Sequence, residues 1–135
     1  MVRVVSGIVK AAAVLYVKDI DRVSAFYERC LGLVVADAAE SYRVLESEAW
    51  TLSLVAVADE VAATIDIAVP PRRREDVPVK LAFAVPSIED VRHVAASLGG
   101  GVDRKDDEWD FRGCQHCDGV DPEGNVIQLR EPPAK

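Results

Sequence analysis

The feature that most constrains the fold is one pattern that occurs twice along the chain. Residues 17–20 (Val-Lys-Asp-Ile) correspond to residues 85–88 (Val-Pro-Ser-Ile) at an offset of 68, and Leu31-Gly32 corresponds to Leu98-Gly99 at an offset of 67. Two strand-to-helix junctions and two helix ends thus recur at a nearly constant spacing. Internal duplication is the economical explanation, and the chain is expected to fold as two similar units.

The first unit is predicted to form a strand, a helix and three further strands. Residues 11–17 form an apolar run of strand length, and Asp19 stands at an N-cap position before a helix from about Ile20. Gly32 is expected to end this helix in the left-handed conformation. One apolar stripe on it is wide enough to cover a sheet, formed by Val23, Phe26, Tyr27, Cys30 and Leu31. Strands are then predicted at Leu33–Asp37, Ser41–Leu45 and Trp50–Val57.

The second unit repeats this order after a proline-rich linker. A strand at Val79–Val85 leads to a helix capped by Ser87, which Gly99-Gly100-Gly101 ends. Asp121–Asn125 supplies a tight turn with a Pro, a Gly and an Asn. The remaining strands are predicted around Trp109–Gly113, Cys114–Gly119 and Asn125–Arg130.

These elements predict an α+β fold in a single domain over residues 1–135. Module one covers about residues 9–58, a linker covers 59–78, and module two covers about 79–131. Each module is a βαβββ unit whose helix must bury one face, so the helices should lie on one side of a curved mixed sheet. A concave groove on the other side is then the natural ligand site.

Composition narrows the range of partners. The net charge is −7 and the pI is about 4.8, which argues against nucleic acid because phosphate binding needs clustered Lys and Arg. The basic run Arg72-Arg73-Arg74 precedes Glu75 and Asp76, so a solvated loop is favoured over an anion site. No apolar run approaches ~20 residues, and residues 1–7 are too short an apolar stretch for a secretory signal. We therefore expect no membrane partner and a cytoplasmic location.

Two stretches resemble a known superfamily. They are Val17-x-Asp19 with Phe26-Tyr27 and Leu31-Gly32-Leu33 in the first unit, and Asp121-Pro-Glu-Gly-Asn-Val-Ile-x-Leu129 in the second. These sequence motifs are similar to those of the vicinal oxygen chelate (VOC) superfamily, which contains glyoxalases, bleomycin resistance proteins and extradiol dioxygenases. The resemblance implies the fold of two βαβββ modules. It leaves function open, because the superfamily holds both metal-dependent enzymes and metal-free binding proteins.

The resemblance also implies where a catalytic metal would lie. The matching positions are Ala12, Ser53, Lys80 and Gln128. Ala12 has no donor atom, Lys80 presents a cation, and the other two side chains are neutral and weak ligands. We therefore expect no metal and no cofactor. The favoured function is a glyoxalase/bleomycin resistance-like protein that binds a small molecule in the groove; the alternatives are a metal-dependent lyase, isomerase or dioxygenase, and a non-catalytic structural or interaction protein.

Strand alternation gives the candidate site. Side chains that alternate with the core-facing ones should face the groove, and the six chosen as ligand-binding are Tyr16, Ser53, Val55, Lys80, Gln128 and Arg130. Lys80 is expected either to extend its ammonium to the groove mouth or to hold an acceptor such as Gln128, Ser53 or a ligand oxygen. A homodimer is expected from the superfamily's habit of completing or flanking the groove with a second chain. No catalytic residue is assigned.

The Cys-Gln-His-Cys stretch at residues 114–117 is compatible with more than one role. In an extended strand Cys114 and His116 share a face while Cys117 points the other way, so the sulfurs converge only if a turn or bulge intervenes. A structural role is favoured, and a peripheral metal site or an oxidation-sensitive pair is the alternative. With three cysteines and no export signal, reduced thiols are expected.

Overall fold

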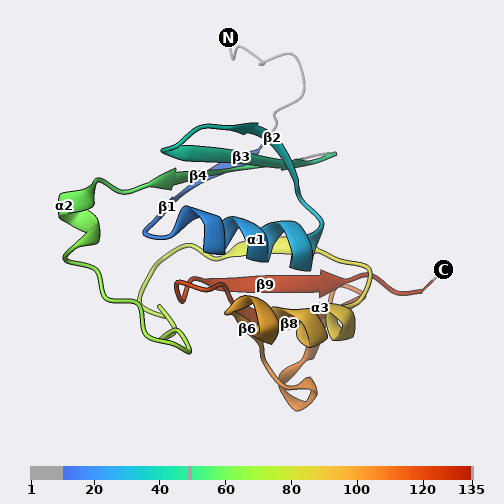
Figure 1. The fold of residues 1–135 in the computed structure, drawn as a ribbon. Helices are drawn as coiled ribbons and strands as arrows, with labels where there is room; N and C mark the ends of the chain where they lie inside the picture. Colours follow the sequence, from blue (N-terminus) through green and yellow to red (C-terminus); the bar gives the residue numbers. More distant parts are fainter. Residues whose placement is uncertain (1–10, 49, 135) are drawn as a thin grey trace, which may run out of the picture.

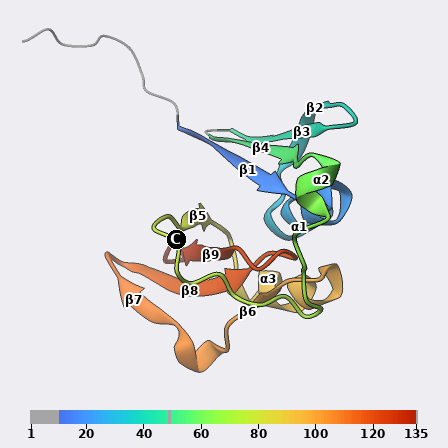
Figure 2. The ribbon, with the colours of Figure 1, turned by 90° about the vertical axis from the view of Figure 1, so that its left-hand side faces the viewer.

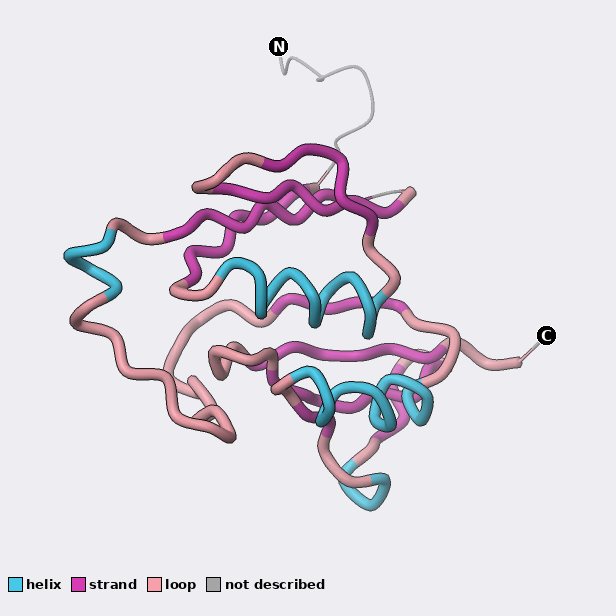
Figure 3. Tube along the Cα trace, in the orientation of Figure 1, coloured by secondary structure: helices cyan, strands magenta, loops and turns pink. Residues whose placement is uncertain are grey.

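The computed structural model describes residues 11–48 and 50–134, arranged as two small sheets with helices against them (Figure 1). The predicted start of module one at residue 9 and the expectation about residues 1–7 lie outside the described residues. Figure 3 separates the helices, the strands and the long connecting segment between the two units. The α+β fold class predicted from the repeat is confirmed.

The first unit forms a four-stranded mixed sheet. Its elements are β1 (Ala12–Val17), α1 (Ile20–Leu31), β2 (Val34–Ala38), β3 (Tyr42–Ser47) and β4 (Trp50–Ala56). The strand order is β1-β4-β3-β2, with β1 parallel to β4 and the other pairs antiparallel. A parallel pair needs a crossover connection, and α1 begins that crossover.

The second unit repeats this plan with a modified middle. Its elements are β5 (Leu81–Ala84), α3 (Ile88–Ala95), β6 (Gly101–Val102), β7 (Trp109–Phe111), β8 (Cys114–Val120) and β9 (Val126–Glu131). The order is β5-β9-β8-β6, with β7 also paired to β8 and only β5–β9 parallel. Short 3₁₀ turns at Ala96–Leu98 and Lys105–Asp107 flank β6. Gly101 was expected to belong to the glycine run that ends the helix, but it begins the short strand β6, which pairs with β8.

Helix α1 begins and ends where the sequence predicts. The Asp19 side chain accepts a hydrogen bond from the backbone N–H of Arg22 at 3.1 Å, which satisfies one of the otherwise unpaired first-turn donors. Gly32 has φ +71°, the left-handed conformation that costs a glycine least. In the second unit the Ser87 hydroxyl caps α3 by accepting from the Asp90 N–H at 3.1 Å.

Both helices lie on the same side of the sheets, and the core fills the space beneath them (Figure 2). Residues of β1, β4, β5 and β9 that face the helices join one continuous cluster with the apolar stripes of α1 and α3. It includes Val17, Phe26, Leu54, Phe83, Val91, Ile127 and Leu129. Strand alternation therefore assigned the buried side of these strands correctly.

The turn before β9 joins the two units. Asp121 is fully buried, and its carboxylate accepts from the Tyr27 hydroxyl at 2.8 Å and from the backbone N–H groups of Glu123 and Asn125. Burial, followed by the nearby Asp121 charge, raises the pKa of Tyr27 well above its ordinary value. Glu123 accepts from the backbone N–H groups of Lys18 and Asp19. The closing turn of the second unit is thus hydrogen-bonded to the start of α1.

The linker follows a fixed course across this same turn. It contains a short helix, α2 (Asp59–Ala62), and a bridge in which the Arg74 N–H donates to the Gly124 carbonyl at 2.9 Å. A Cβ added at Gly124 would lie 2.0 Å from the Arg72 carbonyl oxygen, so the close approach requires glycine there. Among the described helices, none is long and apolar enough to cross a membrane.

Candidate functional site

The side of each sheet that faces away from the helices carries the residues predicted for the groove. We call these surfaces the open face of the first sheet and the open face of the second sheet. On the first, Ala12, Val14 and Tyr16 of β1 pair with Thr51, Ser53 and Val55 of β4. Tyr16 is 66% exposed and Val14 58% exposed, so this surface is apolar and accessible to solvent.

The open face of the second sheet is polar by contrast. Lys80 directly precedes β5, and its ammonium donates to Asp118 Oδ2 on β8 at 2.9 Å. Asp118 stands opposite Gln128 of β9, whose Oε1 accepts from Arg130 Nε at 2.8 Å. The expected acceptors for Lys80 were Gln128, Ser53 or a ligand oxygen, and the structure instead places the cation on Asp118.

Asp118 is unusual because its two oxygens differ. Oδ2 holds Lys80, whereas Oδ1 is inaccessible and has no hydrogen-bond partner among the described residues. A buried carboxylate oxygen without a donor costs free energy, because its hydration is lost without replacement. The ion pair with Lys80 offsets only a small part of that cost, because the Lys80 side chain is 42% exposed and solvent screens its charge. A buried polar atom without a partner calls for an explanation, and a ligand is one, so we take this pair as the centre of the candidate site.

An aromatic cluster stands beside the polar pairs. His116 of β8 is 4% exposed, stacked on Trp109 at 5.5 Å between ring centroids and edge-on to Phe111 at 5.8 Å. Its Nδ1 lies 3.1 Å from the Cys114 carbonyl oxygen. A carbonyl can only accept, so Nδ1 carries a proton in this contact and Nε2 retains a lone pair when the ring is neutral. His116 stands opposite Arg130, which puts an imidazole and a guanidinium on the same open face.

The strand geometry places the sulfurs of Cys114 and Cys117 on opposite sides of β8. β8 runs without interruption through residues 114–120, so His116 lies on the open face while Cys117 lies in the core beneath the helices. Cys117 contacts Arg92 Nη2 at 3.6 Å, and burial raises the pKa of its thiol. Burial also raises the pKa of Cys30 to about 11. Cys30, Cys114 and Cys117 are all free thiols.

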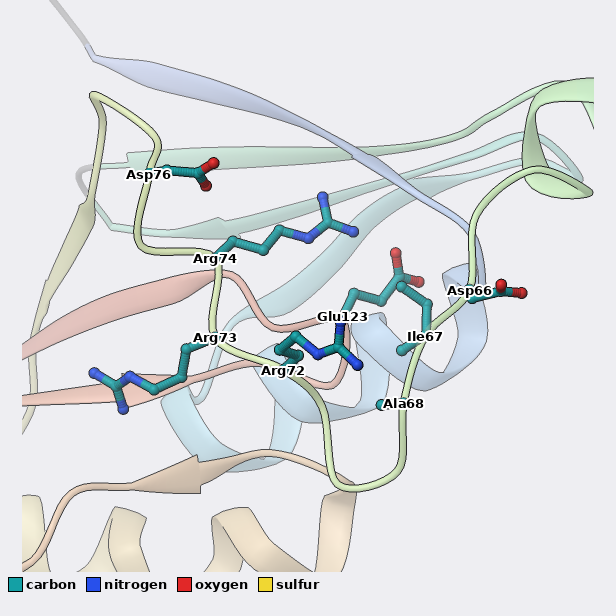
Figure 4. Close-up of a pocket in the computed structure, with 8 residues that line it drawn as sticks. All are labelled: Asp66, Ile67, Ala68, Arg72, Arg73, Arg74, Asp76 and Glu123. Atoms are coloured by element: carbon teal, nitrogen blue, oxygen red, sulfur yellow. The ribbon is translucent and has the colours of Figure 1, made fainter.

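One cavity borders the second open face. It has a volume of about 210 Å³ and is lined by Lys80, Asp118 and Val126 together with the linker residues 73–75, Val77 and Val79. The linker therefore lies against this face and forms part of its wall. A second cavity of about 460 Å³ lies farther along the linker (Figure 4) and shares Arg73 and Arg74 with the first.

The positions at which relatives hold a metal do not fit one here. Ala12 offers a methyl group, the Lys80 ammonium is already paired with Asp118, and the Gln128 oxygen accepts from Arg130. Over residues 11–48 and 50–134, no three His, Cys, Asp or Glu side chains gather closely enough to hold a metal ion. The side chains at these four positions, a methyl, a hydroxyl, an ammonium and an amide, are not a donor set that suits a divalent metal.

Strand alternation placed all six predicted site residues on open faces, but it divided them between two surfaces. Tyr16, Ser53 and Val55 belong to the first sheet; Lys80, Gln128 and Arg130 belong to the second or its margin. Asp118 and His116 share the open face with Gln128, and sequence reasoning did not select them. The hairpin turn at residues 121–125 carries the signal, because it fixes which β8 residues stand opposite Gln128 and Arg130.

Comparison with known proteins agrees with this architecture. Residues 12–130 match the family model described as a glyoxalase-like domain. The chain therefore belongs to the glyoxalase-like family, within the vicinal oxygen chelate superfamily that its motifs resemble. A search of curated protein sequences found no match.

Solved structures share the fold at low sequence identity. A glyoxalase/bleomycin resistance protein/dioxygenase family enzyme from Burkholderia phytofirmans PsJN has TM-score 0.66 and 18% identity over 90% of this chain and 97% of its own. A glyoxalase/bleomycin resistance protein from Albidiferax ferrireducens T118 has TM-score 0.63 and 20% identity over 91% and 98%. The fosfomycin resistance protein FosX from Listeria monocytogenes has TM-score 0.62 and 13% identity over 98% and 95%. At these identities the likeness concerns the fold alone.

Proposed function

We propose that the chain binds a small organic molecule on the open face of the second sheet, without a catalytic metal. The observation that carries this proposal is the Lys80–Asp118 pair, 2.9 Å apart at the edge of a cavity and at a position where relatives would hold a metal ligand. In such a site the ammonium supplies a fixed positive charge that a metal would otherwise provide. A ligand oxygen beside Lys80 would take the place of water on the exposed part of the ion pair.

The surroundings support a ligand of mixed character. Arg130 and Gln128 offer further polar groups on the same face, and the exposed edges of Trp109 and Phe111 offer apolar contact. Small-molecule sites combine apolar walls with a few placed polar groups in this manner. We expect a compound with at least one carbonyl, carboxylate or hydroxyl oxygen.

The test is a ligand-observed NMR screen of a metabolite library, followed by titration of each binder against variants. Lys80→Met is expected to weaken binding about tenfold or more, because a charge-assisted hydrogen bond is lost. Lys80→Gln keeps a donor for Asp118 and separates loss of charge from loss of the Asp118 contact. Lys105→Met removes another exposed ammonium, distant in sequence from Lys80, and should leave binding unchanged. Equal affinity of wild type and Lys80→Met for every binder, or a library with no binder, would contradict the proposal.

An enzymatic function is the second candidate, and His116 is the observation that favours it. A neutral imidazole with Nδ1 directed at the Cys114 carbonyl has an available lone pair on Nε2, the arrangement of a general base. A superfamily lyase, isomerase or dioxygenase would need metal ligands other than those matched above. Turnover of a binder by wild type, lost in His116→Gln with binding retained, would favour this candidate.

We also propose a homodimer that covers the open face of the first sheet. Val14, Tyr16 and Val34 are large apolar side chains on that face, exposed by 58%, 66% and 65%. Large apolar side chains left exposed on one face of a sheet are typical of an interface. A second copy of the chain is the partner that the proposal names.

A further inference from the structure

The cavity of about 460 Å³ beside the linker has no part in the function proposed above. Its walls are Asp66, Ile67 and Ala68 on one side, Arg72–Arg74 with Asp76 on the other, and Glu123 between them (Figure 4). The volume lies within the ~300–1,000 Å³ that small-molecule sites occupy. The walls are also held in place, since Arg74 N–H donates to the Gly124 carbonyl and Lys18 Nζ donates to the Ile65 carbonyl.

The three consecutive arginines separate into two groups. The Arg73 guanidinium points away from those of Arg72 and Arg74 (Figure 4), and it pairs with Asp103 at 2.7 Å and Glu75 at 2.9 Å. Side chains at alternate positions of an extended segment point to the same side. Arg72 and Arg74 therefore both point into the cavity, on the side opposite to the Arg73 guanidinium. Among the described residues, neither of these two guanidiniums has an ion-pair or hydrogen-bond partner within the distances that define such contacts.

The carboxylates in the lining are engaged or directed elsewhere. Glu123 is 5% exposed, and its oxygens accept from the backbone N–H groups of Lys18 and Asp19 at 2.7 to 2.9 Å. Those donors precede and begin helix α1, so the Glu123 charge is balanced by that helix terminus. Asp66 is exposed, and its carboxylate points away from both arginines in Figure 4. Asp76 is exposed at the rim, where solvent screens its charge.

We infer that this linker cavity is a second binding site, which takes an oxyanion through Arg72 and Arg74. Guanidinium presents paired N–H donors that match the oxygens of a carboxylate or a phosphate, and this cavity is lined by two guanidiniums without partners among the described residues. The ligand class is a small molecule with a carboxylate or phosphate. Because Arg74 also lines the cavity beside Lys80, the oxyanion site adjoins the second open face, and the inference does not depend on what that face binds.

The negative net charge of the protein makes anion binding a specific test of the arginine cluster. A chain of net charge −7 repels anions in general, so saturable anion binding must come from a local cluster of cations. The full chain is labelled with ¹⁵N and titrated with inorganic phosphate, and separately with sodium acetate, at an ionic strength held constant with sodium chloride. We expect saturable shifts of the amide signals of residues 66–68 and 72–76 with at least one anion. The titration that saturates at the lower anion concentration shows whether the site prefers a phosphate or a carboxylate.

Variants decide whether the arginines carry the binding. Arg72→Gln and Arg74→Gln are each expected to weaken the saturable phase about tenfold or more, since each removes one charge-assisted contact. Arg112→Gln is the matched control, because Arg112 is an exposed arginine in the turn between β7 and β8. Circular dichroism confirms that each variant is folded. Shifts that do not saturate with either anion, or that persist equally in Arg72→Gln and Arg74→Gln, would overturn the inference, whatever the outcome at Lys80.

Discussion

The two sheets occupy corresponding places in a repeated unit, and β1 in one is the counterpart of β5 in the other. Their helix-covered sides are alike, each burying aliphatic residues under one helix. Their open faces differ: the first presents Val14 and Tyr16 to solvent, and the second carries the Lys80–Asp118 pair. The two units thus share the packing beneath their helices, whereas their open faces, which have no such packing partner, differ in chemistry. The proposals above give ligand binding to the polar face and self-association to the apolar face.

The largest expected effect is at the contact that holds the two units together. Asp121→Ala would leave the Tyr27 hydroxyl and the N–H groups of Glu123 and Asn125 without their acceptor in a buried site. We expect the free energy of unfolding to fall by about 3 kcal/mol or more, measured by urea denaturation. Asp110→Ala, at an exposed carboxylate on β7, should change it by less than ~0.5 kcal/mol. Equal stabilities of the two variants would mean that the units do not depend on this turn.

The next effect tests the apolar face. Val14→Asp combined with Tyr16→Asp should shift the chain from dimer to monomer at micromolar concentration, because like charges would then face each other across a desolvated contact. Ala84→Asp places a charge on the second open face and should leave the mass unchanged. Sedimentation velocity measures both. A wild-type chain that is monomeric, or a double variant that stays dimeric, would remove the distinction drawn between the faces.

The smallest effect concerns the helix-covered side. Burial raises the pKa of Cys30 to about 11, so about one thiol in a thousand is ionised at pH 8. Alkylation of Cys30 by iodoacetamide, followed by mass spectrometry, should therefore be about a hundredfold slower than that of an ordinary exposed thiol. The rate should rise about tenfold per pH unit between pH 7 and 9, because a raised thiol pKa keeps the thiolate scarce throughout that range. A rate that levels off by pH 9 would contradict the assigned burial.

Much of the fold was predictable because it rests on local signals. The cap at Asp19, the stripe on α1 and the left-handed Gly32 are encoded within a few residues, and strand alternation assigned the two sides of β1 and β9. The strand β6 was missed because it consists of two residues that follow a run of glycines. Such a segment has no periodicity from which to predict a strand.

The candidate site was less predictable because its contacts join distant segments. Lys80 was placed on the correct face, but its partner Asp118 is fixed by the pairing of β8 with β9, which a list of alternating residues does not include. The sequence favoured a solvated loop at residues 72–74. Their separation into a paired Arg73 and two cavity-lining arginines depends on how the linker crosses Gly124. Long-range pairing, and not local propensity, determines both features.

The central claim is that the polar face uses its own cation in place of a metal. Elemental analysis of protein purified without chelator tests it most directly, together with calorimetric titration of Zn²⁺ and Mn²⁺ into the wild type, Gln128→Ala and His116→Gln. We predict less than about one tenth of a metal ion per chain and no stoichiometric binding in any of the three, because Ala12 has no donor and Lys80 is paired with Asp118. Close to one Zn, Fe, Ni or Mn per chain in the wild type, lost in Gln128→Ala or His116→Gln, would contradict it.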